Sequence, residues 1–214
     1  AKYEMAIATE EHIKDNCFDG EKYRECFNNI TGDIHDWKDC AMEKEGIVEV
    51  TDSSKIYNGI KLFSLVRATD KMNHTSVGIS NGFIVDLTPP VAGTSYAGSI
   101  LGTHLNWQQS KNQVAANWAN FYDPESKIEG YELGLGTTPD DDDVRAFRTM
   151  GTSTVGAMYG LDLKLNFTYY VLVRATDGAG WQNVSASPGF AVDDTPPLCI
   201  VYDGNNAELA AMAF

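Results

Sequence analysis

Hydrophobic and polar residues alternate along several short stretches of this chain, and the clearest is YYVLVRA at residues 169–175. Successive side chains of a β-strand point to opposite faces, so the odd-numbered residues from Tyr169 to Ala175 are expected to share a core face. Gly178 and Gly180 then predict a turn. A second strand is expected from Val184 to Val192, before the Pro196-Pro197 pair, which has no amide protons for a sheet.

Similar stretches predict further short strands upstream, separated by compact turns. The turns are expected at Asp123–Ser126 and at Thr138–Asp143. Some seven short strands with regular turns are typical of an antiparallel β-sandwich. The additional predicted strands cover residues 47–50, 113–118, 128–136, near 144–149 and 153–159.

The stretch at 163–197 occurs twice. Residues 56–90 match it at a constant offset of 107, with 15 identities in 35 positions and no gap. Self-similarity at a fixed period indicates one structural unit used twice, and a period near 100 corresponds to a whole small domain. The sequence therefore predicts tandem domains.

The first copy carries an insertion. Residues 3–9 match residues 131–137 at an offset of 128, which leaves about 21 extra residues (128 − 107) within 10–46. This polar stretch is expected to be a disulfide-pinned loop, with short helical turns in EEHIKDNCF (10–18) and DWKDCAMEKE (36–45).

The net charge and the hydrophobicity of the chain limit the kinds of molecule that it is expected to bind. The net charge of −14 disfavours nucleic acids and anionic lipids, which require clusters of Lys and Arg. No apolar run is long enough to cross a bilayer, so we expect no membrane insertion within this segment.

Four Asn-x-Ser/Thr sequons and four cysteines in a β-rich chain favour a secreted or cell-surface glycoprotein carrying N-linked glycans. The sequons begin at Asn29, Asn73, Asn166 and Asn183, and the cysteines are Cys17, Cys26, Cys40 and Cys199.

The cysteines divide unevenly between the predicted domains. Thr195-Pro196-Pro197 fixes two φ angles and is expected to form a stiff joint between domains. This joint and a whole sandwich separate Cys199 from the other three cysteines, and a disulfide needs Cα atoms within roughly 7 Å. We therefore expect at most one internal pair, of which Cys17–Cys26 is the preferred choice. The remaining cysteine and Cys199 are then expected to bond outside this segment, including to a neighbouring chain in a covalent polymer.

The order of landmark residues in the complete copy resembles the fibronectin type III domain. In that family the tryptophan lies on strand B, the first tyrosine on strand C, and a leucine and later tyrosine form the corner before strand F. The landmarks are Trp118, residues 128–131, Leu163, residues 169–175 and residues 178–180.

The resemblance implies an all-β fold of tandem seven-stranded antiparallel β-sandwiches, with roles in adhesion or matrix. Residues 88–195 would be the complete domain. Residues 1–87 would be a partial domain starting at strand C, with its insertion at 10–46, and residues 196–214 the start of a third, so both terminal domains would be incomplete. The first unit departs from the pattern, because Leu62 occupies the corner-tyrosine position and the corner hydrogen bond should be missing there.

The sequence contains no recognised catalytic pattern. The four histidines lack metal-ligand spacing, and neither a nucleophile elbow nor a phosphate-binding loop is present. Asp123 with Glu125 is interpreted as a turn rather than a catalytic carboxylate pair. We expect no enzymatic activity and no cofactor.

Two acidic groups raise the question of a Ca²⁺ site. The preferred interpretation of the first group is a solvated turn, because four consecutive side chains point in different directions. An interdomain Ca²⁺ site is the alternative for Asp193-Asp194 with Asp177. The members of the first group are Asp140, Asp141, Asp142 and Asp143.

The outer face of the main strand offers a possible interface. Tyr170 and Leu172 point away from the core, as do their counterparts Phe63 and Leu65. Either these side chains cover small neighbours such as Gly134 and Ala6, or they form an apolar stripe that packs against another chain. Trp107 and Trp181 are interpreted as loop anchors, with sugar stacking as the alternative.

Together these features predict a structural or adhesive segment of a modular glycoprotein. It would act by domain stacking and contact with other protein chains or copies of itself, including in filaments. The alternatives are a receptor ectodomain that binds a protein ligand and a glycan-binding accessory module of an enzyme.

Overall fold

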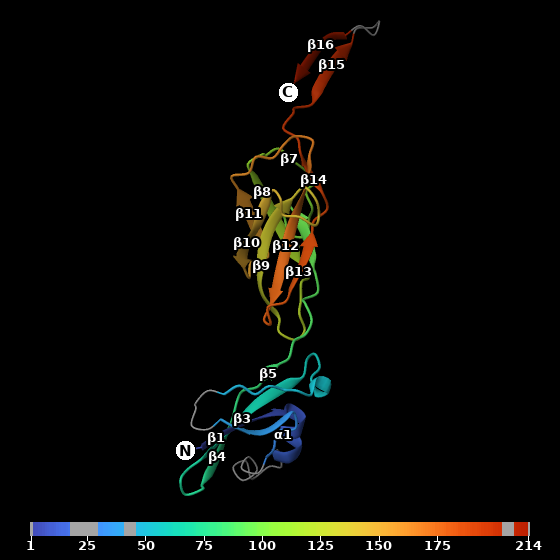
Figure 1. Cartoon of the computed structure of the whole chain (residues 1–214). Coiled ribbons are helices and arrows are strands. Elements are labelled where there is room, and N and C mark those ends of the chain that lie inside the picture. The colour runs from blue at the N-terminus through green and yellow to red at the C-terminus, as the bar shows by residue number, and fades with distance from the viewer. Residues whose placement is uncertain (1, 18–29, 41–45, 203–207, 214) are drawn as a thin grey trace. The chain divides into compact units, whose positions relative to one another are not determined.

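The computed structural model describes residues 2–17, 30–40, 46–202 and 208–213, and only the backbone for Cys17 and residues 198–213. The chain packs as two compact units, Ala1–Thr88 with Pro124–Ser126 and Pro89–Asp123 with Lys127–Phe214 (Figure 1). Strands dominate both.

The first unit contains one described sheet, in the order β2-β1-β3-β4, with β5 paired to β3 and all pairs antiparallel. Its helix α1 and the short 3₁₀ turn η1 lie in the connections on either side of β2. The elements are β1 (Lys2–Thr9), α1 (Glu10–Cys17), β2 (His35–Asp39), η1 (Ser53–Lys55), β3 (Lys61–Thr69), β4 (Thr75–Ile79) and β5 (Phe83–Ile84).

The second unit is a fibronectin type III-like β-sandwich. One sheet has the order β10-β9-β12-β14-β7 with β13 paired to β12, and the other has the order β11-β8-β6. Counting β6 with β7 and β13 with β14 as interrupted single strands leaves the seven strands expected. The elements are β6 (Thr94–Ala97), β7 (Trp107–Gln108), β8 (Gln113–Ala119), β9 (Ile128–Gly136), β10 (Arg145–Gly151), β11 (Val155–Tyr159), β12 (Thr168–Asp177), β13 (Gln182–Ala186) and β14 (Phe190–Val192).

The core of the sandwich follows the predicted alternation. Tyr169 is 3% exposed and Val171, Val173 and Ala175 are fully buried in one cluster with Trp118. The Trp118 ring meets that of Tyr131 edge to face, with centroids 5.6 Å apart. The core face assigned to the main strand from sequence is confirmed.

Three local expectations need correction. The stretch from Val184 to Val192 forms two strands rather than one, because Pro188 has no amide proton and interrupts the ladder. The helix at 10–17 is present, whereas the second helical turn, expected at 36–45, is replaced by strand β2 over its first part. No strand forms at residues 47–50, where one was expected. Beyond the second unit's sandwich, after Pro197, the chain forms two paired antiparallel strands, β15 (Leu198–Tyr202) and β16 (Glu208–Ala213).

Both units build the same central strand pair. Tyr3 lies opposite Ala68 and Ala6 opposite Leu65 on β1 and β3. The residues shifted by 128 and 107 repeat these pairs on β9 and β12, where Tyr131 lies opposite Ala175 and Gly134 opposite Leu172. The sequence repeat is therefore a repeat of strand register.

The next strand locates the insertion. Glu4 pairs with Asp39 on β2, and the equivalent Glu132 pairs with Thr149 on β10, an offset of 110 (149 − 39). Of the 21 extra residues, 18 (128 − 110) therefore lie between β1 and β2, and 3 (110 − 107) between β2 and β3. The insertion replaces the short β9–β10 turn.

The corner before β12 is closed by Tyr169. Its hydroxyl oxygen accepts a hydrogen bond from the backbone amide of Lys164 at 2.7 Å. In the first unit the equivalent Leu62 is 3% exposed and lies in an apolar cluster with Ile7 and Ile60. Leucine has no hydroxyl group, so this bond is absent at Leu62.

Tyr169→Phe should remove that hydrogen bond and leave the Lys164 amide without its acceptor, which costs about 1 to 2 kcal/mol of unfolding free energy. Chemical denaturation of the whole chain would measure the loss, and hydrogen exchange would show faster exchange at Lys164. Tyr170→Phe, which changes the neighbouring residue on the opposite face, is the matched control. Equal effects of both variants would contradict the assignment.

Candidate functional site

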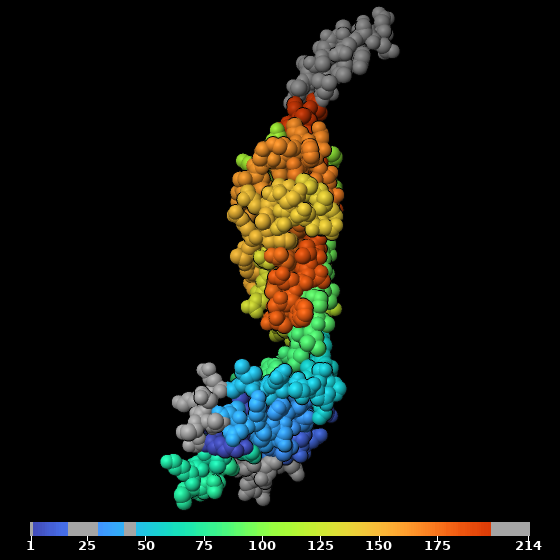
Figure 2. Space-filling model, viewed as in Figure 1, coloured from blue at the N-terminus to red at the C-terminus, as the bar shows by residue number. Residues whose placement is uncertain are grey.

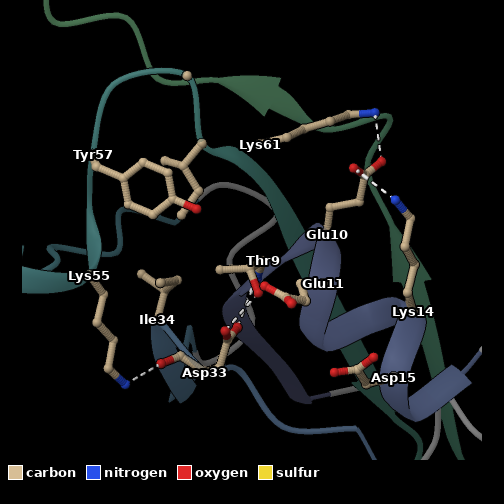
Figure 3. Close-up of a pocket in the computed structure, with 12 residues that line it drawn as sticks. Thr9, Glu10, Glu11, Lys14, Asp15, Asp33, Ile34, Lys55, Tyr57 and Lys61 are labelled. Atoms are coloured by element: carbon tan, nitrogen blue, oxygen red, sulfur yellow. Dashed lines mark hydrogen bonds and ion pairs between the residues drawn. The ribbon is translucent and has the colours of Figure 1, made fainter.

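A pocket of about 780 Å³ opens in the first unit where β1 passes into α1 (Figure 3). Charged side chains from α1, from the segment before β2 and from the residues around η1 line it. Sequence reasoning did not find this pocket. The one signal available was Thr9 followed by Glu10 and Glu11, since a hydroxyl residue ahead of acidic residues is typical of a helix start.

Thr9 and Asp33 form a clamp at the mouth of the insertion. The Thr9 amide and hydroxyl donate to the two carboxylate oxygens of Asp33 at 2.8 and 2.7 Å. The same hydroxyl oxygen accepts from the His12 amide at 3.1 Å and so caps α1. The clamp thereby ties both ends of the 18-residue insertion together.

The remaining charges in the pocket also engage one another. Glu10 pairs with Lys14 at 3.0 Å and with Lys61 at 3.4 Å, and its hydrogen bond with Lys14 holds its pKa below the ordinary value (Figure 3). Lys55 donates to the backbone carbonyl of Asp33 at 2.7 Å. These charges of the described lining thus pair with one another and with the backbone, and they fasten the insertion.

The acidic turn of the second unit repeats the clamp. Thr137 donates from its amide and hydroxyl to Asp143, both at 2.7 Å, and these bonds, the amide's first, lower the pKa of Asp143. Asp142 accepts from the Phe147 amide at 2.8 Å. No three of the carboxylates from Asp140 to Asp143 converge in this fully described turn. Two of the four Ca²⁺ candidates therefore bind backbone or threonine.

The hypothesis of an exposed apolar stripe needs correction at its centre. Leu65 is fully buried and Leu172 is 1% exposed, although both lie on the outer face of their sheets. In the first unit Leu65 packs against Ile13 and Ile30 of the insertion, with Phe63 partly buried beside them. Neither leucine offers surface to a partner.

In the second unit the covering residue comes from β10. A Cβ atom at Gly134 would meet the Phe147 ring at 3.2 Å, so the ring lies directly over the glycine opposite Leu172. In Figure 2 golden side chains from around residue 145 lie over the front of this unit, where Figure 1 draws β9 and β12. The interpretation that large side chains cover bare backbone fits this face.

An arginine on the outer face completes the cover in both units. Arg67 contacts Glu4 at 2.9 Å and stacks over Trp37 at 4.4 Å. Arg174 likewise contacts Glu132 at 2.7 Å and stacks over Phe147 at 4.1 Å. Each arrangement links three neighbouring strands.

The sequons differ in access. Asn73 and Asn166 are exposed and lie in turns with φ near +60°, at 64° and 60°. Asn183 is half-buried on β13, and its side-chain nitrogen, the atom that carries a glycan, donates to the Pro90 carbonyl at 2.9 Å. Asn29 lies outside the described residues.

The remaining aspartates singled out from the sequence make local structural contacts. Asp123 accepts from the Lys127 amide at 3.2 Å, as expected of a turn aspartate. Asp193 accepts hydrogen bonds from Thr195, and Asp194 pairs with Lys111. These contacts differ from the Ca²⁺ site considered for the two residues together with Asp177.

The two tryptophans with a possible role in sugar stacking are exposed, and one cysteine can be described. Trp107 and Trp181 are 62% and 48% exposed. Cys40 has a free thiol, while the side chains of Cys17, Cys26 and Cys199, and hence the proposed Cys17–Cys26 pair, lie outside the described residues.

The chain shows similarity to solved structures but not to known families or curated proteins. No protein-family model matches the chain, and no curated protein matches it. A solved structure of the FN1–FN3 domains of chicken contactin-1 (CNTN1) is similar at 15% identity and a TM-score of 0.49, over 89% of this chain and 55% of that one. The chain thus spans about half the length of that structure. Among the described helices none is long and apolar enough to cross a membrane.

Glycosylation should follow the difference in exposure between the sequons at Asn73 and Asn166 and the sequon at Asn183. In chain secreted from eukaryotic cells, peptide mass spectrometry after glycosidase treatment should find Asn73 and Asn166 modified and Asn183 unmodified, because its amide is held by Pro90. Asn73→Gln and Asn166→Gln should each remove one glycan mass, and Asn183→Gln none. A glycan at Asn183 alone would contradict the reasoning.

Glu4 should make the first unit sensitive to acid. The hydrogen bond from Arg67 lowers the pKa of Glu4 below its ordinary 4.5. The stabilisation is therefore complete above pH 4.5 and is lost as the pH falls through the lower folded pKa.

Glu4→Gln should cost about 0.5 to 1 kcal/mol near pH 7 and nothing at the lowest pH. Denaturation at a series of pH values would measure both. Glu11→Gln, at an exposed carboxylate, is the control, and a Glu4→Gln effect that persists unchanged into acid would refute the assignment.

Proposed function

We propose that this chain is a non-catalytic, adhesive or structural segment of a secreted or cell-surface glycoprotein, built from tandem fibronectin type III-like domains. It acts by domain stacking and contact with other protein chains or copies of itself. The polar clusters described above support the absence of catalysis, because clamps, caps and stacked arginines occupy them. The observation that carries the proposal is an ordered apolar segment on the second unit.

This segment, residues 99–107, comprises the connection after β6 and the first residue of β7, and it exposes four large apolar side chains. The exposed fractions are 70% for Ile100, 66% for Leu101, 41% for Leu105 and 62% for Trp107. Scattered single apolar residues are normal on a protein surface, whereas four within eight positions indicate an interaction surface.

A buried side chain holds this segment in place. Asn117 on β8 is 1% exposed; its oxygen accepts from the Gly102 amide at 2.8 Å and its nitrogen donates to the Gly98 carbonyl at 3.0 Å. The Leu105 amide also donates to Ala97 at 2.8 Å. A segment ordered before binding loses less conformational entropy when a partner docks, which raises affinity.

A glycan-binding module is the second candidate. The exposed Trp107 offers a ring for stacking on a sugar, and the next residue, Gln108, lines a pocket of about 510 Å³ together with Tyr159. However, the Gln108 amide already donates to the carbonyls of Ser110 and Gln113, at 2.6 and 2.9 Å. We therefore favour a protein partner.

The decisive variant is Ile100→Ser with Leu101→Ser, which removes the two most exposed apolar side chains and keeps the Asn117 contacts. Beads coated with the wild-type chain should aggregate or adhere to cells, and the double variant should lose at least about tenfold in either assay. Met72→Ser with Val184→Ser, at other exposed apolar positions, is the control. A fully adhesive Ile100→Ser/Leu101→Ser variant, or wild-type beads that bind soluble oligosaccharides alone, would overturn the proposal.

A further inference from the structure

The same aspartate-capped turn occurs at the end of the main strand in both units. It joins β3 to β4 at Asp70 and β12 to β13 at Asp177. In each turn the aspartate Oδ1 accepts from the backbone amides two and four residues later, at 2.7 and 2.9 Å for Asp70 and at 2.9 Å twice for Asp177. One carboxylate oxygen thus satisfies the turn and the other is left over.

The leftover oxygens have different surroundings. In the first unit Oδ2 of Asp70 is exposed and lies 3.1 Å from Nδ1 of His74. In the second unit Asp177 is 1% exposed, and its Oδ2 has no hydrogen-bond partner or cation among the described residues. Buried polar atoms are rarely left in this state, and a buried charge requires a partner.

What lies beside Asp177 is a second carboxylate. Asp123 is 6% exposed, and oxygens of the two carboxylates approach within 4.8 Å. Backbone bonds hold both residues in place, since the Lys127 amide donates to Asp123 and the Gly178 amide donates to the Lys127 carbonyl at 3.2 and 3.0 Å. The fold therefore brings two buried negative charges together and keeps them there.

We propose that Asp123 and Asp177 of the second unit bind a Ca²⁺ ion. A cation between the two carboxylates removes their repulsion and gives the Asp177 Oδ2 its missing partner. Carboxylate oxygens suit Ca²⁺, whereas Zn²⁺ and Cu²⁺ sites use His or Cys, and Ca²⁺ tolerates the irregular geometry that Mg²⁺ does not. Water supplies the remaining ligands, so the affinity falls in the range of extracellular modules, about 10⁻⁴ to 10⁻³ M.

This inference is independent of the adhesive surface. Asp177 ends β12, whereas Trp107 pairs through Ala191 with Thr168 at the start of that strand. The ion therefore binds at the opposite end of β12 from Trp107. Loss of one property therefore leaves the other measurable.

The test uses the whole chain, freed of metal with a chelator and titrated with CaCl₂. Calorimetry should show a site with a Kd near the millimolar range, and Ca²⁺ at about ten times that concentration should raise the thermal midpoint of the second unit by about 5 °C. Mg²⁺ at the same concentration should have a smaller effect.

Asp177→Asn keeps an oxygen for the turn amides and replaces the anionic Oδ2 with an uncharged amide NH₂ group, which cannot bind a cation. It should weaken Ca²⁺ binding at least tenfold and abolish the thermal shift while folding normally, and Asp123→Asn should do the same. Asp70→Asn makes the same change in the equivalent exposed turn and should leave the Ca²⁺ response intact. It is therefore the matched control.

Three results would overturn the proposal. The first is no thermal shift or heat of binding with wild type at about 10 mM Ca²⁺, well above the expected Kd. The second is an equal loss in Asp70→Asn, which would indicate diffuse binding to an acidic chain. The third is wild-type stability that is insensitive to Ca²⁺ but rises as the pH is lowered, which would mean that the two carboxylates share a proton instead.

Discussion

The pairing of a small residue with a large one across the central strands organises both units. Gly134 lies opposite Leu172, and Ala6 lies opposite Leu65. The small residue leaves room on the outer face of the sheet, and an aromatic ring from the next strand, Phe147 or Trp37, occupies it. An arginine then stacks on that ring and pairs with a glutamate, which sets the position of three strands relative to one another.

A second device, the Thr–Asp clamp, explains how the first unit accepts a long insertion. Thr9 with Asp33 and Thr137 with Asp143 make the same two hydrogen bonds at the ends of very different connections. Because the clamp fixes the ends, the length between them changes without moving the register of the sheet. The insertion then contributes Ile13 and Ile30 to the cover over Leu65.

The clamps and arginine stacks also bear on which residues are available for function. Acidic and basic groups that resemble site residues in the sequence are engaged in helix caps, Thr–Asp clamps and arginine stacks. Two features are not explained by such structural contacts. They are the apolar segment held by Asn117, and the Asp177 carboxylate with an oxygen that no described protein group satisfies. Departures from local consistency commonly mark function, and the two proposals rest on them.

The sequence by itself determined the strands at 113–118, 128–136 and 169–175, within about one or two residues of their ends, and the core face of the last, because a period of two is a local property of the chain. It also located the repeat, and with it the equivalent pairs of strands. Other features depend on residues far apart in the chain, and only the tertiary structure decided them. Leu172 is buried opposite Gly134, which the Phe147 ring covers. The Asn183 amide donates to the Pro90 carbonyl, and Asp177 lies beside a carboxylate 54 positions away (177 − 123). An outward-facing residue in a strand looks the same in sequence whether solvent, a ring or another charge lies over it, because that neighbour arrives only when the sheets pack.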